Sequence, residues 1–89
     1  MTALALSSRR RYVNPMTLRE TFGKRFAEIR KRKGWSMADT GKRFDPPVSP
    51  TYIFQLEHGI DNPTLDQVER VAAVFGVRPQ RLLSPTRNP

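Results

Sequence analysis

The chain has 89 residues, no cysteine and a formal net charge of +8 at pH 7. This length fits a single small domain, and the lack of cysteine excludes disulfides and thiolate metal sites. No apolar run approaches the roughly 20 residues needed to cross a bilayer, so we expect a cytoplasmic protein with no membrane partner.

The charge is distributed unevenly along the chain. Residues 1–44 contain twelve Lys and Arg against three acidic residues, whereas residues 45–89 contain four against five. A strongly cationic half is typical of a surface that faces phosphate groups or a membrane. The ordinary alternative is a solvated helix face that only keeps the protein soluble.

The N-terminal region predicts an arm followed by a first helix. Residues 1–16 lack a helical period and include Arg9, Arg10 and Arg11, which predicts a flexible basic arm. Thr17 with Glu20 forms a capping-box pattern, and Gly34 is a typical helix stop. Apolar side chains recur at helical spacing between them, at Leu18, Phe22, Phe26 and Ile29.

Two short helices are predicted next. Ser36, with Asp39 three residues later, begins the second helix, and Asp45-Pro46-Pro47 breaks it because proline lacks an amide hydrogen. Ser49 caps the third helix, with Pro50 at its first position. We expect Met37 or Thr40, Gly41 and Phe44 to face inward from the second helix, and Ile53 and Leu56 from the third.

The C-terminal part predicts two more helices and a tail. Thr64 and Gln67 cap a fourth helix that Gly76 closes, and Pro79–Leu83 fits a short fifth helix. Residues 84–89 form a polar tail. The sequence therefore predicts an all-α domain over residues 17–83, a compact five-helix bundle without strands.

From about Phe22 to Leu83 the sequence resembles the Cro and phage-repressor class of helix-turn-helix domains, also called the xenobiotic-response-element family. The matching stretches are Ile29-Arg30-Lys31-Arg32-Lys33-Gly34-Trp35-Ser36, Val48-Ser49, Ile53-Phe54-Gln55-Leu56-Glu57-His58-Gly59, Asn62-Pro63-Thr64-Leu65 and Ala72-Ala73-Val74-Phe75-Gly76-Val77. The resemblance implies a lambda-repressor-like fold and a transcriptional regulator, most simply a repressor, that binds double-stranded DNA.

The resemblance also assigns the recognition helix to about residues 49–58. It would enter the major groove, with the second helix lying across it. We expect base contacts from Pro50, Thr51, Tyr52 and Gln55, since a glutamine amide can pair with both N6 and N7 of adenine. This helix has no Lys or Arg, so phosphate contacts are expected mainly from outside it, at Arg9, Arg10, Arg11, Ser36, Lys42 and Arg43. A further phosphate contact is expected from its cap, Ser49.

Other positions are expected to have structural roles. By the resemblance, Arg30 and Glu57 form a partly buried ion pair, Gly41 lets two helices approach closely, and Trp35 fills the core. Phe54 stands where the family usually has a polar residue. We expect it in a side pocket, and the alternative is exposure to a partner.

The family pattern is altered at two places. Met37 replaces a common glutamine, which removes one usual phosphate contact. Asp45-Pro46-Pro47 lengthens the turn by about two residues relative to the family, which would change the angle between the helices.

Catalytic chemistry has little support in this sequence. His58 is the only histidine, which leaves no Ser-His-Asp triad and no site with two histidine ligands. No glycine-rich loop precedes a helix. We therefore expect that the chain is not an enzyme and that it binds no metal and no cofactor.

Three readings of the partner remain. The leading one is a homodimer on a pseudo-palindromic operator, with a dimer surface around Phe75, Val77, Leu82 and Leu83 unless these residues complete the core. The second keeps the fold but makes the chain a DNA-binding antitoxin or a restriction-modification controller, whose main partner is a toxin or another protein. The third makes residues 18–33 a basic amphipathic segment that binds a membrane or a calmodulin-type protein.

Overall fold

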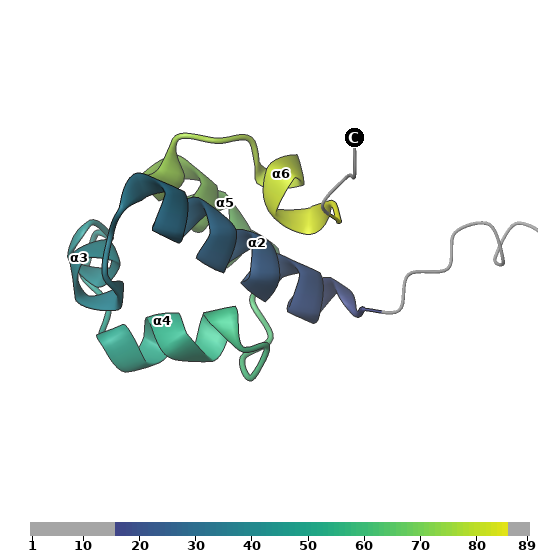
Figure 1. The fold of residues 1–89 in the computed structure, drawn as a ribbon, viewed down its shortest axis with the longest axis horizontal. Helices are drawn as coiled ribbons and strands as arrows, with labels where there is room; N and C mark the ends of the chain where they lie inside the picture. The colour runs from purple at the N-terminus through teal and green to yellow at the C-terminus, as the bar shows by residue number, and fades with distance from the viewer. Residues whose placement is uncertain (1–15, 86–89) are drawn as a thin grey trace, which may run out of the picture.

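The computed structural model describes residues 16–85, and within that range it contains five helices and no strand (Figure 1). They are α2 (Leu18–Lys33), α3 (Met37–Lys42), α4 (Pro50–Glu57), α5 (Leu65–Phe75) and α6 (Pro79–Leu83). The predicted all-α fold is confirmed. Of the predicted arm and tail, residues 1–15 and 86–89 lie outside the described residues.

Local capping sets the helix boundaries at the predicted positions. Thr17, Ser36 and Thr64 each accept a hydrogen bond from the backbone of the third residue of the helix that follows, and each forms a complete capping box. Gly34 and Gly76 end α2 and α5 with φ angles of 75° and 71°, a left-handed conformation that favours glycine.

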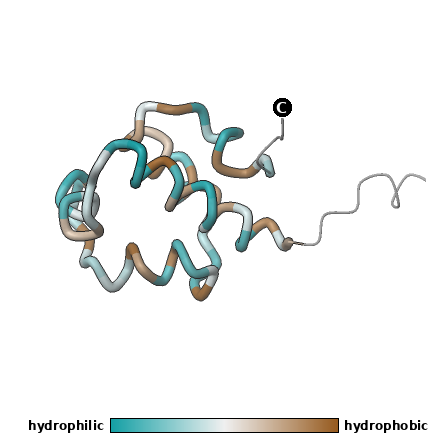
Figure 2. Tube along the Cα trace, viewed as in Figure 1, coloured by the Kyte–Doolittle hydropathy of each residue, from teal (hydrophilic) through white to brown (hydrophobic). Residues whose placement is uncertain are grey.

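The core forms where α2 packs against α4 and α6. Hydrophobic and hydrophilic residues alternate along α2 as the helix turns (Figure 2). The buried apolar residues are Phe22, Phe26, Ile29, Phe44, Ile53, Leu56, Val68, Val71, Ala72, Phe75 and Leu82. Phe22, Phe26 and Ile29 of the apolar stripe of α2 are thus covered by this chain's own helices, which argues against the membrane or calmodulin reading, whereas Leu18 is 61% exposed. Within residues 16–85, no helix has the length and apolar character to cross a membrane.

The predicted dimer surface needs correction. Phe75 and Leu82 are buried, 2% and 0% exposed, whereas Val77 and Leu83 lie half-buried at the edge of the core. The alternative that these residues complete the core is therefore correct. An apolar residue in a helix pattern indicates an inward side chain, but not whether its own chain or another copy covers it.

Two glycines allow the close approach of α4 to its neighbours. A Cβ atom on Gly41 of α3 would lie 2.2 Å from the carbonyl oxygen of Val48, just before α4. The Val48 amide in turn donates to the Gly41 carbonyl at 3.0 Å. A Cβ atom on Gly23 of α2 would lie 2.5 Å from the Glu57 carbonyl oxygen. The contact at Gly41 agrees with the prediction, and the contact at Gly23 was not foreseen.

Residues 43–49 connect α3 to α4. Phe44 is buried in the core and Val48 is half-buried, so both ends of the long turn are fixed to the domain. The peptide bond between Asp45 and Pro46 is cis. The segment leads directly to the Ser49 cap, so α3 and α4 remain in contact despite the insertion.

Candidate nucleic-acid interface

One side of α4 faces the core and the other faces solvent. Ile53 and Leu56 are fully buried on the inner side. A helix turns about 100° per residue, so residues three, four and seven positions apart share one side of it. The side opposite Ile53 and Leu56 carries Thr51 and the residues three, four and seven positions after it. These residues are Thr51, Phe54, Gln55 and His58, which we call the outer stripe; Gln55 is half-buried and the other three are exposed.

Neither Gln55 nor Thr51 has a side-chain hydrogen bond to another residue in the described part of the chain. Both side chains can donate and accept hydrogen bonds. Pro50 is exposed at the first position of the same helix. The outer stripe therefore presents unpaired polar side chains in the first turn of α4, at Thr51, and in its second half, at Gln55.

Tyr52 lies beside the outer stripe rather than on it. It is half-buried, and its hydroxyl accepts a hydrogen bond of 2.6 Å from the Gln67 side chain of α5. Burial, followed by the nearby charge of Asp61, raises the pKa of the Tyr52 phenol. The phenol therefore stays protonated at neutral pH, and its hydrogen remains able to donate to another acceptor.

Serine hydroxyls cap both α3 and α4. Ser49 Oγ accepts from the Tyr52 amide at 3.1 Å, and Ser36 Oγ accepts from the Asp39 amide at 2.9 Å. Each hydroxyl keeps its own hydrogen for an outside acceptor. Hydrogen bonding to Ser36, first through its backbone amide, lowers the pKa of Asp39, so this carboxylate stays charged beside Ser36.

The C-terminal end of α2, α3 and the start of α4 meet at one side of the domain (Figure 1). Exposed cations lie on or directly after the first two of these segments, at Lys31, Arg32, Lys33, Lys42 and Arg43. Lys42 is exposed, and the guanidinium of Arg43 lies 4.0 Å from the centroid of the Trp35 ring. Trp35 also stacks on Phe75 with ring centroids 5.9 Å apart, and is thus half-buried at the core edge. Of the predicted phosphate contacts, Ser36, Lys42, Arg43 and Ser49 lie near this end, while Arg9, Arg10 and Arg11 lie outside the described residues.

The Arg30–Glu57 ion pair is present and joins α2 to the last turn of α4. Arg30 Nε donates to Glu57 Oε2, and Nη2 donates to Oε1 at 3.1 Å. The third nitrogen, Nη1, donates to the Trp35 carbonyl at 2.8 Å. Only 10% of the Arg30 side chain and 4% of the Glu57 side chain are exposed. Glu57 is therefore fixed inside the domain and holds the orientation of α4.

The pocket expected for Phe54 is absent, and the ring is 43% exposed. It stacks on the imidazole of His58, with ring centroids 3.9 Å apart and planes inclined by 20°. His58 Nδ1 lies 2.9 Å from the Phe54 carbonyl oxygen and must donate, since that oxygen can only accept. The pocket prediction was wrong because Phe54 lies on the outer stripe, a position that the helical spacing from Ile53 and Leu56 could have revealed.

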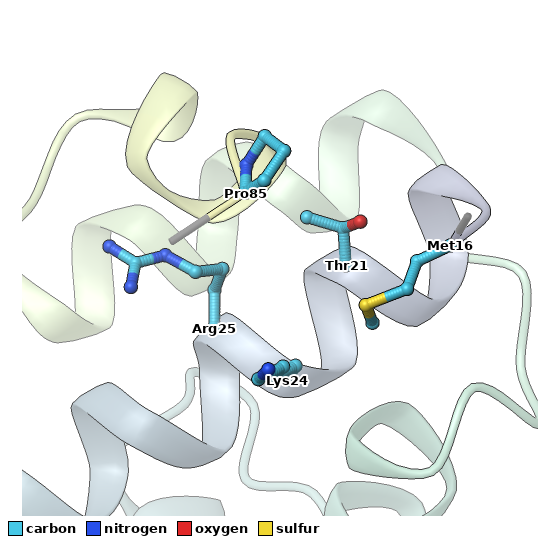
Figure 3. Close-up of a pocket in the computed structure, with 5 residues that line it drawn as sticks. All are labelled: Met16, Thr21, Lys24, Arg25 and Pro85. Carbon is cyan, nitrogen blue, oxygen red and sulfur yellow. The ribbon is translucent and has the colours of Figure 1, made fainter. Parts of the chain in front are cut away.

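A small cavity of about 180 Å³ lies away from α4. Figure 3 shows Thr21 rising from α2 between Met16 and Pro85, with Lys24 and Arg25 further along the helix. The Thr21 hydroxyl is buried without a hydrogen-bond partner among the described residues. The cavity is smaller than the roughly 300–1,000 Å³ of usual small-molecule sites, and no residue of the outer stripe of α4 lines it.

Comparison with known proteins decides the family. The helix-turn-helix family model matches residues 26–82, which include α3, α4 and α5 completely. The chain belongs to this helix-turn-helix family, of the xenobiotic-response-element type. Its members are DNA-binding regulators of transcription, so this chain is one as well. Within the fold, α3 and α4 are the two helices of the motif.

Individual relatives agree with this assignment. The chain is 33% identical over 69 residues to control protein C.BamHI of Bacillus amyloliquefaciens, covering 78% of this chain and 84% of that protein. It is 32% identical over 71 residues to HTH-type transcriptional regulator y4dJ of Sinorhizobium fredii, covering 80% and 90%. The crystal structure of the hypothetical transcription factor NHTF from Neisseria superimposes with a TM-score of 0.72 at 27% identity, covering 82% of each chain.

Proposed function

We propose that the outer stripe of α4 enters the major groove of an operator and reads its bases, while α3 lies across the groove. Gln55 pairs with N6 and N7 of an adenine, and Thr51 and Pro50 contact neighbouring base edges. The observation that carries this proposal is the exposed outer side of α4, where the side chains of Gln55 and Thr51 have no hydrogen bond to another residue within residues 16–85.

Contacts with DNA phosphates on both sides of α4 then hold the domain in position. The Ser36 and Ser49 hydroxyls donate to phosphate oxygens, and Lys42 and Arg43 supply positive charge. Tyr52 is better placed for a phosphate than for a base, because it flanks the outer stripe with its hydroxyl already held by Gln67. Arg9, Arg10 and Arg11 add sequence-independent attraction.

The chain acts as a homodimer that represses transcription. Exposed apolar side chains lie beyond the C-terminal end of α4, with Leu18 61% and Leu65 77% exposed beside a groove of about 160 Å³. Gly59, just after α4, lies against Glu20 of α2 at the same end. A second copy meeting this end would place both α4 helices on one side of a duplex, as a pseudo-palindromic operator requires.

Selection of bound duplexes from a random pool tests the proposal. The enriched sequences should contain two inverted half-sites whose centres lie about 10–10.5 base pairs apart, or a multiple of that. Sedimentation of the unliganded chain should give a dimer that the substitution Leu65→Glu dissociates, whereas Leu65→Met leaves it intact. Failure to enrich any duplex at modest ionic strength would overturn the proposal.

A restriction-modification controller is the second candidate, favoured by the similarity to a control protein over most of both chains. In this case the enriched site would lie upstream of restriction or methylation genes.

An antitoxin would instead keep its operator beside a toxin gene and form a stoichiometric complex with the purified toxin. In each case we expect the chain to have no catalytic activity of its own and to act in the cytoplasm.

A further inference from the structure

Phe54 is the one large apolar side chain on the outer stripe, and it is 43% exposed, so covering it with an apolar group of a binding partner would be favourable. The residues three positions before it and one after it are Thr51 and Gln55, which share its side of α4. We propose that Phe54 packs against the 5-methyl group of a thymine and makes that base a determinant of the operator. This inference rests on the proposed docking of α4 in the major groove.

The structure holds the Phe54 ring in place before DNA binds. One face of the ring stacks on His58 at 3.9 Å between centroids, which leaves the remainder of the ring directed away from the core. His58 itself is fixed by its hydrogen bond of 2.9 Å to the Phe54 carbonyl. A side chain ordered in advance loses less conformational entropy on binding. The stacked pair therefore forms a preformed apolar surface on a polar helix.

Base chemistry identifies what this surface would contact. Among the four bases, thymine displays a methyl group in the major groove, and apolar side chains including phenylalanine recognise it. α4 contains no Lys or Arg to bind guanine. Because Phe54 and Gln55 are adjacent, the thymine should lie within about one or two base pairs of the adenine bound by Gln55. The half-site is thus expected to contain two A·T pairs close together, one read by Gln55 and one by Phe54.

Replacing thymine with deoxyuridine tests the contact, because it removes only the 5-methyl group. The probe is the duplex selected from the random pool, with each thymine of one half-site replaced singly. The intact wild-type chain should lose about fourfold in affinity at one thymine, as expected for burying a single methyl group. Phe54→Ala should bind the unmodified duplex more weakly and show no loss at that thymine.

Matched variants separate this contact from the rest of the interface. Gln55→Ala should bind weakly but keep its sensitivity to deoxyuridine, and thermal melting checks that each variant is folded. Equal sensitivity in wild type and Phe54→Ala, or none in wild type, would overturn the role of Phe54 while leaving groove docking intact. If the wild-type chain binds no duplex at all, the proposed docking of α4 fails as well.

Discussion

Arg30 and Glu57 show how a single pair of side chains fixes the orientation of a recognition helix. Both side chains are almost fully buried, and Arg30 also binds the Trp35 carbonyl. We expect Glu57→Ala to lower the free energy of unfolding by about 3–5 kcal/mol, because it leaves a buried guanidinium without its counter-charge. Urea denaturation measures this. The exposed Glu69→Ala on α5 should change stability by no more than about 0.5 kcal/mol.

Tyr52 gives a pH-dependent prediction. Burial raises the pKa of its phenol in the folded chain, so the protonated phenol stabilises the fold below the ordinary pKa of about 10. That contribution disappears as the pH rises through the folded pKa. The chain has two tyrosines, so the difference in absorbance at 295 nm between wild type and Tyr52→Phe, followed against pH, reports the ionisation of Tyr52 alone. Its midpoint should lie above 10; a midpoint at or below that value contradicts the burial of the phenol in the folded chain.

At the scale of elements, the packing of α3 against the start of α4 depends on Gly41. An alanine methyl would lie 2.2 Å from the Val48 carbonyl, which is backbone and cannot swing aside. Gly41→Ala should therefore destabilise the domain by about 1–3 kcal/mol, as overpacking usually does, and weaken operator binding by changing the angle between the helices. Lys42→Ala, at the exposed next position, should weaken DNA binding but leave the melting temperature unchanged. An unchanged melting temperature for Gly41→Ala would contradict this packing.

The helices could be predicted from sequence because their signals are local. Thr17, Ser36 and Thr64 each act within three residues of themselves, and their capping boxes all occur as expected. Contacts between distant residues could not be predicted in the same way. The hydrogen bond from Gln67 to Tyr52 joins positions 15 residues apart, and nothing in the spacing of either residue indicates it.

The candidate site was predicted less completely than the fold. The resemblance assigned the recognition helix, but we grouped Tyr52 with the outer side chains and expected Phe54 in a pocket rather than exposed. Both depend on the rotation of α4 about its axis, which Ile53 and Leu56 determine by being fully buried. The core positions of Phe75 and Leu82 likewise depend on which helices pack around them.

At the scale of the whole molecule, most positive charges lie outside the helix that is proposed to read bases. Twelve of the sixteen Lys and Arg lie in residues 1–44, and the helix proposed to read bases contains none. Deleting residues 1–12 removes Arg9, Arg10 and Arg11, and should weaken binding to every duplex and flatten the salt dependence of affinity. Titrations at several salt concentrations measure the slope. An unchanged slope would mean that these arginines do not contact phosphate.

The most direct test of the account is the base preference of Gln55→Ala. Binding is measured for duplexes that carry each of the four base pairs at every position of the selected half-site. The wild-type chain should prefer adenine at one position by about 1–3 kcal/mol, and the variant should lose that preference there and nowhere else. A variant that keeps all the wild-type preferences would contradict the reading of DNA by α4.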